Sequence, residues 1–98
     1  SEALQGEPGE YIVVVRRAGD SFFLGAGTND EPRTLTQKLG FLKSGMTYTA
    51  TIYADAPDSA ENPENYRIEK RTVTSADMLE IAMTARGGQA VTFVPVNE

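Results

Sequence analysis

Short apolar segments separated by turn-forming residues make up most of the chain. Residues 11–15 (YIVVV) are an unbroken β-branched and aromatic run, too short for a typical helix, and they predict a central strand buried on both faces. The next apolar residues, Phe22–Leu24, follow the pair Gly19-Asp20. A glycine-first pair fits the two-residue loop of a type II′ hairpin, so we expect the first two strands to pair antiparallel.

Two-residue alternation, which is typical of a strand with one face in the core, marks the middle of the chain. In residues 33–39, Leu35, Gln37 and Leu39 alternate with polar residues, and residues 40–45 predict a loop above the core. The longest alternation covers residues 46–54. Its predicted inward residues are Met46, Tyr48, Ala50 and Ile52, and its predicted outward residues are Thr47, Thr49, Thr51 and Tyr53.

The last third of the chain predicts three more strands, at residues 66–74, 78–84 and 89–96, after an acidic loop at 55–65. No segment has a helical period. Seven short strands joined by turn residues predict an all-β sandwich or barrel. Glycine and proline among acidic residues predict that residues 1–9 form a linker, which leaves residues 10–98 as one domain.

Composition removes several classes of function. The formal net charge is -5 and the Lys and Arg residues are scattered, so nucleic acid and anionic membranes are not expected partners. No apolar stretch approaches the roughly 20 residues of a membrane span, so membrane insertion is not expected either. The chain has neither cysteine nor histidine, which excludes disulfides, thiolate chemistry and Ser-His catalysis.

The acidic residues are the remaining candidates for chemistry. The acidic loop offers oxygen ligands for calcium at Asp55, Asp58, Glu61, Asn62 and Asn65, but their spacing fits no EF-hand, and a solvated loop is the better interpretation. Nothing in sequence order singles out a carboxylate pair for glycoside hydrolysis. We therefore assign no catalytic, cofactor-binding or metal-binding residue, and we expect this chain by itself to be non-catalytic.

Exposed tyrosines suggest a binding function as an alternative. Tyr53 lies on the predicted polar face of its strand and Tyr66 lies beside the acidic loop, and flat rings of this kind can stack on sugars. The chain contains no tryptophan, and most of its aromatic residues are needed for a core. Tyr53 and Tyr66 are therefore candidate sugar or interface contacts, and a carbohydrate-binding module is the alternative function.

Several strings occur together in an order that resembles a known family. They are GEPGEY at 6–11, VVRR at 14–17, FFLG at 22–25, RTL at 33–35, YTATIYAD at 48–55 and GGQA at 87–90. This order is similar to the C-terminal domain of family 97 glycoside hydrolases, over about residues 6–95. The resemblance implies an antiparallel β-sandwich of about seven to eight strands, like the C-terminal domains of α-amylase-like glycosidases.

The same resemblance implies a function for the whole enzyme. Members of the family are bacterial α-glucosidases and α-galactosidases, from the Bacteroides group among others, and are usually exported to the periplasm. A central barrel carries their catalytic carboxylates and a calcium ion, and none of those residues matches this chain. We therefore expect a non-catalytic accessory domain whose partners are the catalytic barrel of its own parent chain and, in a homo-oligomer, a sister subunit.

Overall fold

A computed structural model describes residues 2–55 and 66–96. These residues form antiparallel strands and no helix. The described residues therefore include no helix long and apolar enough to cross a membrane. The strands are β1 (Glu2–Glu7), β2 (Tyr11–Ala18), β3 (Ser21–Thr28), β4 (Arg33–Lys38), β5 (Tyr48–Asp55), β6 (Tyr66–Val73), β7 (Met78–Met83) and β8 (Gly88–Pro95).

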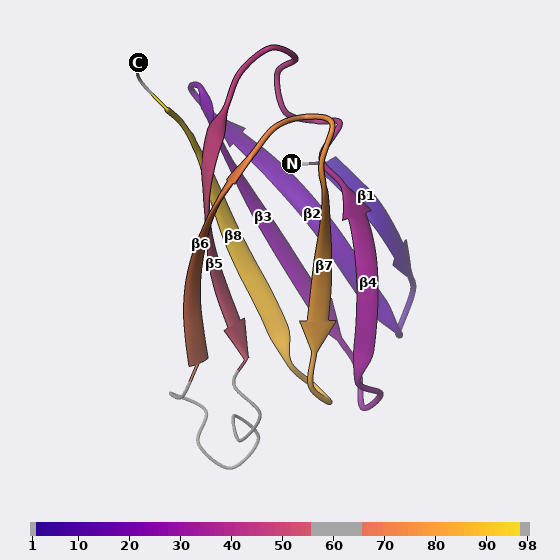
Figure 1. The fold of residues 1–98 in the computed structure, drawn as a ribbon. Helices are drawn as coiled ribbons and strands as arrows, with labels where there is room; N and C mark the ends of the chain where they lie inside the picture. Colours follow the sequence, from indigo (N-terminus) through magenta and orange to yellow (C-terminus); the bar gives the residue numbers. More distant parts are fainter. Residues whose placement is uncertain (1, 56–65, 97–98) are drawn as a thin grey trace.

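Two sheets face each other across one core, which confirms the predicted β-sandwich. The larger sheet has six strands in the order β1-β2-β3-β8-β5-β6, and the smaller sheet is the pair β4-β7. Figure 1 shows the β4-β7 pair lying across one face of the larger sheet. None of the described residues forms a layer over the opposite face of the larger sheet.

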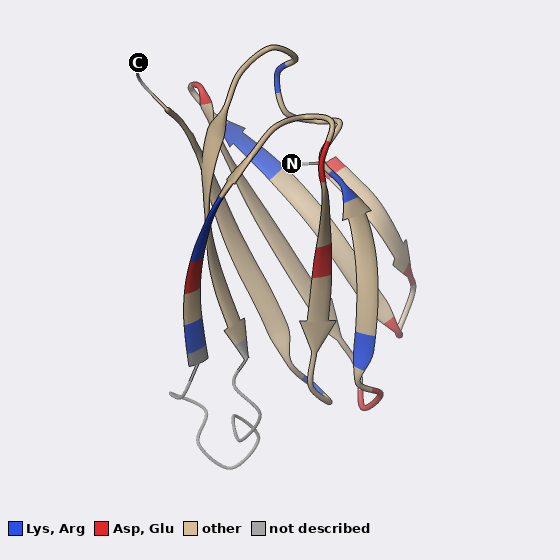
Figure 2. Ribbon diagram, viewed as in Figure 1, with Lys and Arg blue, Asp and Glu red and all other residues tan. Residues whose placement is uncertain are grey.

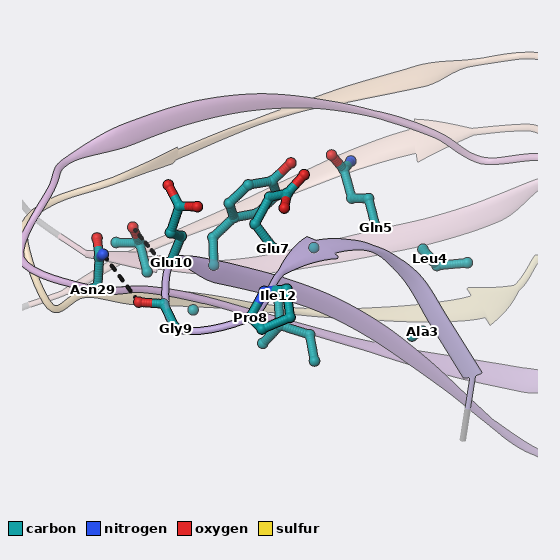
Figure 3. A pocket seen from close by; sticks show the side chains of 13 residues that line it. Ala3, Leu4, Gln5, Glu7, Pro8, Gly9, Glu10, Ile12 and Asn29 are labelled. Carbon is teal, nitrogen blue, oxygen red and sulfur yellow. Dashed lines mark hydrogen bonds between the residues drawn. The ribbon is translucent and has the colours of Figure 1, made fainter.

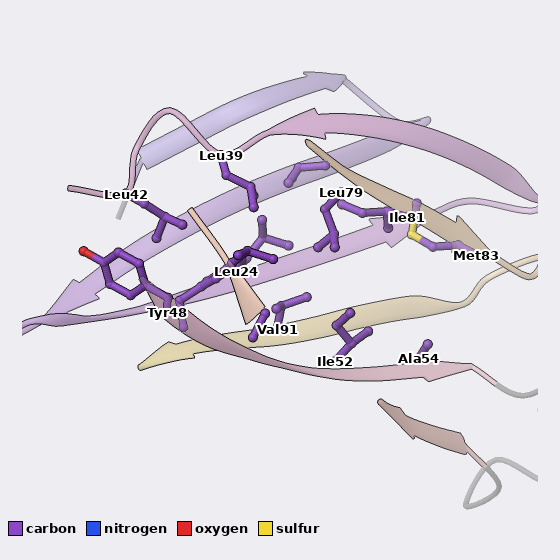
Figure 4. Close-up of a cluster of buried hydrophobic side chains, with 14 residues drawn as sticks. Leu24, Leu39, Leu42, Tyr48, Ile52, Ala54, Leu79, Ile81, Met83 and Val91 are labelled. Carbon is purple, nitrogen blue, oxygen red and sulfur yellow. The ribbon is translucent and has the colours of Figure 1, made fainter. Parts of the chain in front are cut away.

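The core lies between the sheets and is built from the inward halves of the alternating strands (Figure 4). β7 shows the pattern most clearly, because Leu79, Ile81 and Met83 are buried while the residues between them are exposed. Phe93 of β8 and Tyr48 of β5 are the largest fully buried side chains. The alternation predicted for residues 33–39, 46–54 and 78–84 is therefore confirmed, although β5 begins at Tyr48 rather than at Met46.

The prediction of a linker over residues 1–9 is wrong for Glu2–Glu7, which form β1 and pair with β2. A polar strand of this kind is held by backbone hydrogen bonds to its neighbour, so its sequence does not need to alternate between apolar and polar residues. A register shift between Ala3 and Gln5 also breaks the alternation. Leu4 packs partly against the core, and Gln5 donates a 2.8 Å hydrogen bond to Gln37 of β4.

The prediction that residues 11–15 form a central strand buried on both faces is also wrong. β2 is second from the edge, between β1 and β3. Val13 is fully buried against the core, whereas its neighbour Ile12 is 51% exposed. The apolar residues of β2 that point away from the core therefore face the uncovered side of the larger sheet.

The Gly19-Asp20 hairpin is confirmed. Ala18 pairs with Ser21, which leaves a two-residue loop, and Gly19 has φ +63° while Asp20 has no positive φ. A positive φ at the first loop position alone is the signature of a type II′ turn.

Gly19→Ala is therefore expected to lower the free energy of unfolding by about 1–2 kcal/mol, because a Cβ is strained in this conformation. Urea denaturation checks the value. Gly40→Ala is the control, since Gly40 has no positive φ and nothing lies within 4 Å of its added Cβ. Equal losses in the two variants would contradict the assignment of the strain to the turn.

Candidate interaction surface

The side of the larger sheet that points away from β4 and β7 is called the outer face. Directly paired residues of antiparallel strands share a face, so strand pairing defines its membership. Its middle row crosses β2, β3, β8, β5 and β6 at Val14, Gly25, Ala90, Tyr53 and Ile68. The outer face therefore spans the sheet as a continuous surface.

Large apolar side chains are exposed on the outer face. Ile12 is 51% exposed, Ile68 is 58%, Val94 is 49% and Tyr53 is 39%. Tyr53 and Ile68 are direct strand partners, and the small residues Ala90 and Gly25 continue their row toward β2. Val94 lies farther along β8, beyond Thr92. Exposed apolar groups that adjoin in this way mark interaction surfaces, whereas singly scattered ones need no explanation.

The charged side chains that the structure describes on the outer face are both cations. Its next row contains the cations Arg16 and Lys70 at its two ends, with Phe23, Thr92 and Thr51 between them. The Arg16 guanidinium lies 5.2 Å from the centre of the Phe23 ring, a cation–π contact. None of the described side chains on this face is a carboxylate, although the whole chain is acidic. Figure 2 shows the acidic residues in the turns and on β1, β6 and β7.

A shallow depression of about 760 Å³ continues the apolar surface at the β1–β2 turn. In Figure 3, Pro8 and Ile12 lie on one side of this turn, and Glu7 and Glu10 lie on the other. Glu10 Oε1 lies 3.5 Å from Arg33 Nη2, so the Glu10 carboxylate already has a cationic partner. The depression is open and mainly apolar, which suits contact with another surface better than chemistry on a small substrate.

The two tyrosines predicted as contact residues lie on adjacent strands. Tyr53 points outward as predicted, and its strand partners Ala90 and Ile68 flank it with apolar groups. Tyr66 begins β6 opposite Asp55, and its side chain lies outside the described residues. The sugar or interface role of Tyr53 and Tyr66 stays a prediction.

The exposed isoleucines and valine of the outer face were missed from sequence. Ile12, Ile68 and Val94 occupy outward positions of strands whose inward positions are also apolar or charged, so no single strand singles them out. The sequence showed only that single β-branched residues occupy outward positions of separate strands. Such residues indicate an interaction surface only when the order of the strands in the sheet places several of them on one face.

Among residues 2–55 and 66–96, no three acidic side chains are grouped so that they could hold a metal ion. The calcium interpretation of the acidic loop concerned residues 55–65, and residues 56–65 lie outside the described residues.

Comparison with known proteins gives a consistent set of relatives. The model of the family described as "Glycosyl-hydrolase 97 C-terminal, oligomerisation" matches residues 1–94. A curated relative, a retaining alpha-galactosidase of Bacteroides thetaiotaomicron, is 30% identical over 91 residues. That alignment covers 93% of this chain and 14% of the relative.

Solved structures agree with this similarity. A glycoside hydrolase family 97 enzyme from Pseudoalteromonas sp. strain K8, in complex with acarbose, matches with a TM-score of 0.90 and 35% identity. The match covers 97% of this chain and 16% of that enzyme. A beta-arabinopyranosidase matches with a TM-score of 0.70 at 22% identity, which shows a shared fold only. The chain thus spans a small part of its enzyme relatives.

Proposed function

Because this chain belongs to the glycosyl-hydrolase 97 C-terminal, oligomerisation family, we propose that its outer face packs against the catalytic part of the same parent polypeptide. The observation that carries this proposal is the composition of the outer face among its described side chains. It combines adjoining exposed apolar residues with two cations and, among its described side chains, no carboxylate.

Charge favours a different surface over a second copy as the occupant of the outer face. Two copies stacked through this face would bring Arg16 and Lys70 of both copies into one dry interface, with no anion among the side chains that the structure describes there. Unpaired charges of this kind are expensive to bury. An apolar surface with carboxylates opposite Arg16 and Lys70 satisfies both requirements. The 84% or more of each enzyme relative that lies outside the matched segment provides room for such a surface.

The outward side of the smaller sheet is a poorer candidate for this contact. Thr34, Thr36 and Lys38 of β4 and Glu80 of β7 point outward there and surround one exposed apolar residue, Met78, so charges of both signs are interspersed on a mainly polar side. Mixed charged surfaces of this kind are typical of solvent-facing sheets. The outward side of the smaller sheet is therefore suited to contact with water, and the outer face of the larger sheet is suited to burial.

The proposal extends to the parent enzyme as a glycoside hydrolase of the α-glucosidase or α-galactosidase type. The name of the Bacteroides relative supports the second of these. Calcium in the catalytic part and export to the periplasm rest on the family resemblance. This chain contributes packing rather than catalysis.

A carboxylate placed in the middle of the outer face tests the docking. Ala90→Glu is expected to leave the melting temperature of the 98-residue chain nearly unchanged, because Ala90 is exposed. In the complete parent polypeptide it should weaken docking more than about 100-fold, because an unpaired buried charge costs about 3–5 kcal/mol. Differential scanning calorimetry would then show a separate domain transition.

Ala82→Glu is the matched control, since Ala82 is an exposed alanine on β7 of the smaller sheet. It should leave the calorimetric profile of the parent polypeptide unchanged. If Ala90→Glu leaves that profile unchanged as well, the outer face is not the docking surface. Saturable glycan binding by the chain that Tyr53→Ala abolishes would instead favour the carbohydrate-binding alternative.

A further inference from the structure

The two edge strands of the larger sheet differ in how regularly they pair with the strand beside them. β6 is one edge, and its residues pair with β5 from Tyr66 to Val73 without a register shift. β1 is the other edge, where the pairing shifts between Ala3 and Gln5. The side chain of Gln5 on β1 also donates hydrogen bonds to Thr36 and Gln37 of β4. An irregular edge resists further pairing, whereas a long regular edge can accept another strand.

β6 carries charges of both signs on its inward side. Glu69 lies between Arg67 and Arg71. Arg71 donates from Nε to Glu69 Oε2 at 2.6 Å, while Arg67 Nη1 is 3.9 Å from Glu69 Oε1. Glu69 Oε1 therefore has only a loose cationic contact and can accept a better one. About half of each arginine side chain is exposed, so the row lies at the surface.

We propose that a second copy of this chain pairs antiparallel with β6, with the two-fold axis at Ile68. This proposal rests on the family role in oligomerisation and names the strand and register that perform it. A two-fold axis perpendicular to the sheet places Arg67 opposite Glu69 of the second copy, and Glu69 opposite its Arg67. The two Ile68 side chains then meet on the outer face. The two larger sheets become one continuous sheet.

Charge selects this register over its neighbours. An axis at Glu69 places the two Glu69 carboxylates opposite each other, and an axis at Arg67, Lys70 or Arg71 likewise places two like cations opposite each other. Like charges directly opposite are destabilising, and opposite charges are favourable. The axis at Ile68 gives two reciprocal Arg67–Glu69 pairs and no like-charged pair among Arg67, Ile68 and Glu69. Pairing through β6 also leaves most of the outer face available for docking.

Cysteine cross-linking tests the register, because the chain has no cysteine of its own. The axis at Ile68 places the two Ile68 Cα atoms roughly 4.5–5.5 Å apart, which is within the range of a disulfide. Ile68→Cys is therefore expected to form a covalent dimer under mild oxidation at least tenfold faster than Thr72→Cys. Thr72 is exposed on the same strand and face, but its two copies would be about 27 Å apart.

Two comparisons sharpen the result. Ala90→Cys would cross-link fastest if outer faces stack on each other, and that outcome, or equal rates for Ile68→Cys and Thr72→Cys, overturns the proposal. Glu69→Arg should raise the dimer dissociation constant at least tenfold in sedimentation velocity, and Arg67→Glu combined with Glu69→Arg should restore it to within about threefold. Circular dichroism melting checks that each variant folds. A dimer unaffected by Glu69→Arg also overturns the register.

The readouts keep this proposal separate from the docking proposal. Failure of docking appears as an unchanged calorimetric profile for Ala90→Glu in the parent polypeptide. Failure of strand pairing appears as lost selectivity of the Ile68→Cys cross-link in the 98-residue chain. Either result can occur while the other proposal stands.

Discussion

Phe93→Ala is expected to lower the free energy of unfolding by about 3–5 kcal/mol, the usual range for truncation of a buried phenylalanine. Phe93 is fully buried, and its ring lies edge-on to Phe41 at 5.4 Å. The ring centroids of Phe41 and Phe22 are 5.6 Å apart, and those of Phe22 and Tyr48 are 6.1 Å apart. Removing Phe93 therefore leaves a cavity and also frees one end of this aromatic chain.

A loss of this size is a large part of the roughly 5–15 kcal/mol that stabilises a small domain. The melting temperature of the chain should fall by at least about 12 °C, since each kcal/mol corresponds to about 4–8 °C in a domain of this length. Val94→Ala is the control, because Val94 is the next residue on β8 and is 49% exposed. Similar losses in the two variants would show that the aromatic chain does not support the core.

The sequence predicted most of the strands because their residues alternate with the period of a sheet. β7 is the clearest case, since Leu79, Ile81 and Met83 are separated by exposed residues. The β2–β3 hairpin was equally predictable, because only a glycine readily adopts the φ of +63° at Gly19. These signals are local, and each can be read within a few residues.

β1 could not be predicted in this way. Its sequence, EALQGE, has no apolar period, and the strand exists because its backbone groups pair with those of β2. The hydrogen bond from Gln5 to Gln37 joins residues that are 32 positions apart. A strand that depends on distant partners leaves no local signal.

The candidate surface was predictable only in fragments. The outward orientation of Tyr53 followed from alternation, but its apolar neighbour Ala90 comes from a strand that the chain order does not place beside it. β8 lies between β3 and β5 in the sheet although it is the last strand in sequence. Strand order, rather than any motif, brings the apolar residues together on the outer face.

Leu79→Ala is the second large effect, with an expected loss of about 2–5 kcal/mol in the free energy of unfolding. Leu79 is 1% exposed and lies on β7, whose backbone ladder partner is β4. The β4-β7 pair is held to the larger sheet mainly by the side chains packed between the sheets, because the two sheets share no strand ladder. Guanidinium denaturation measures the loss.

Met78→Ala separates packing between the sheets from any property of β7 itself. Met78 precedes Leu79 on the same strand but is 62% exposed, so its truncation should change the free energy of unfolding by less than about 0.5 kcal/mol. A large loss for Leu79→Ala with almost none for Met78→Ala shows that the smaller sheet is retained by its inward face. Equal losses would mean that β7 contributes through its strand propensity, and the smaller sheet would then need another source of attachment.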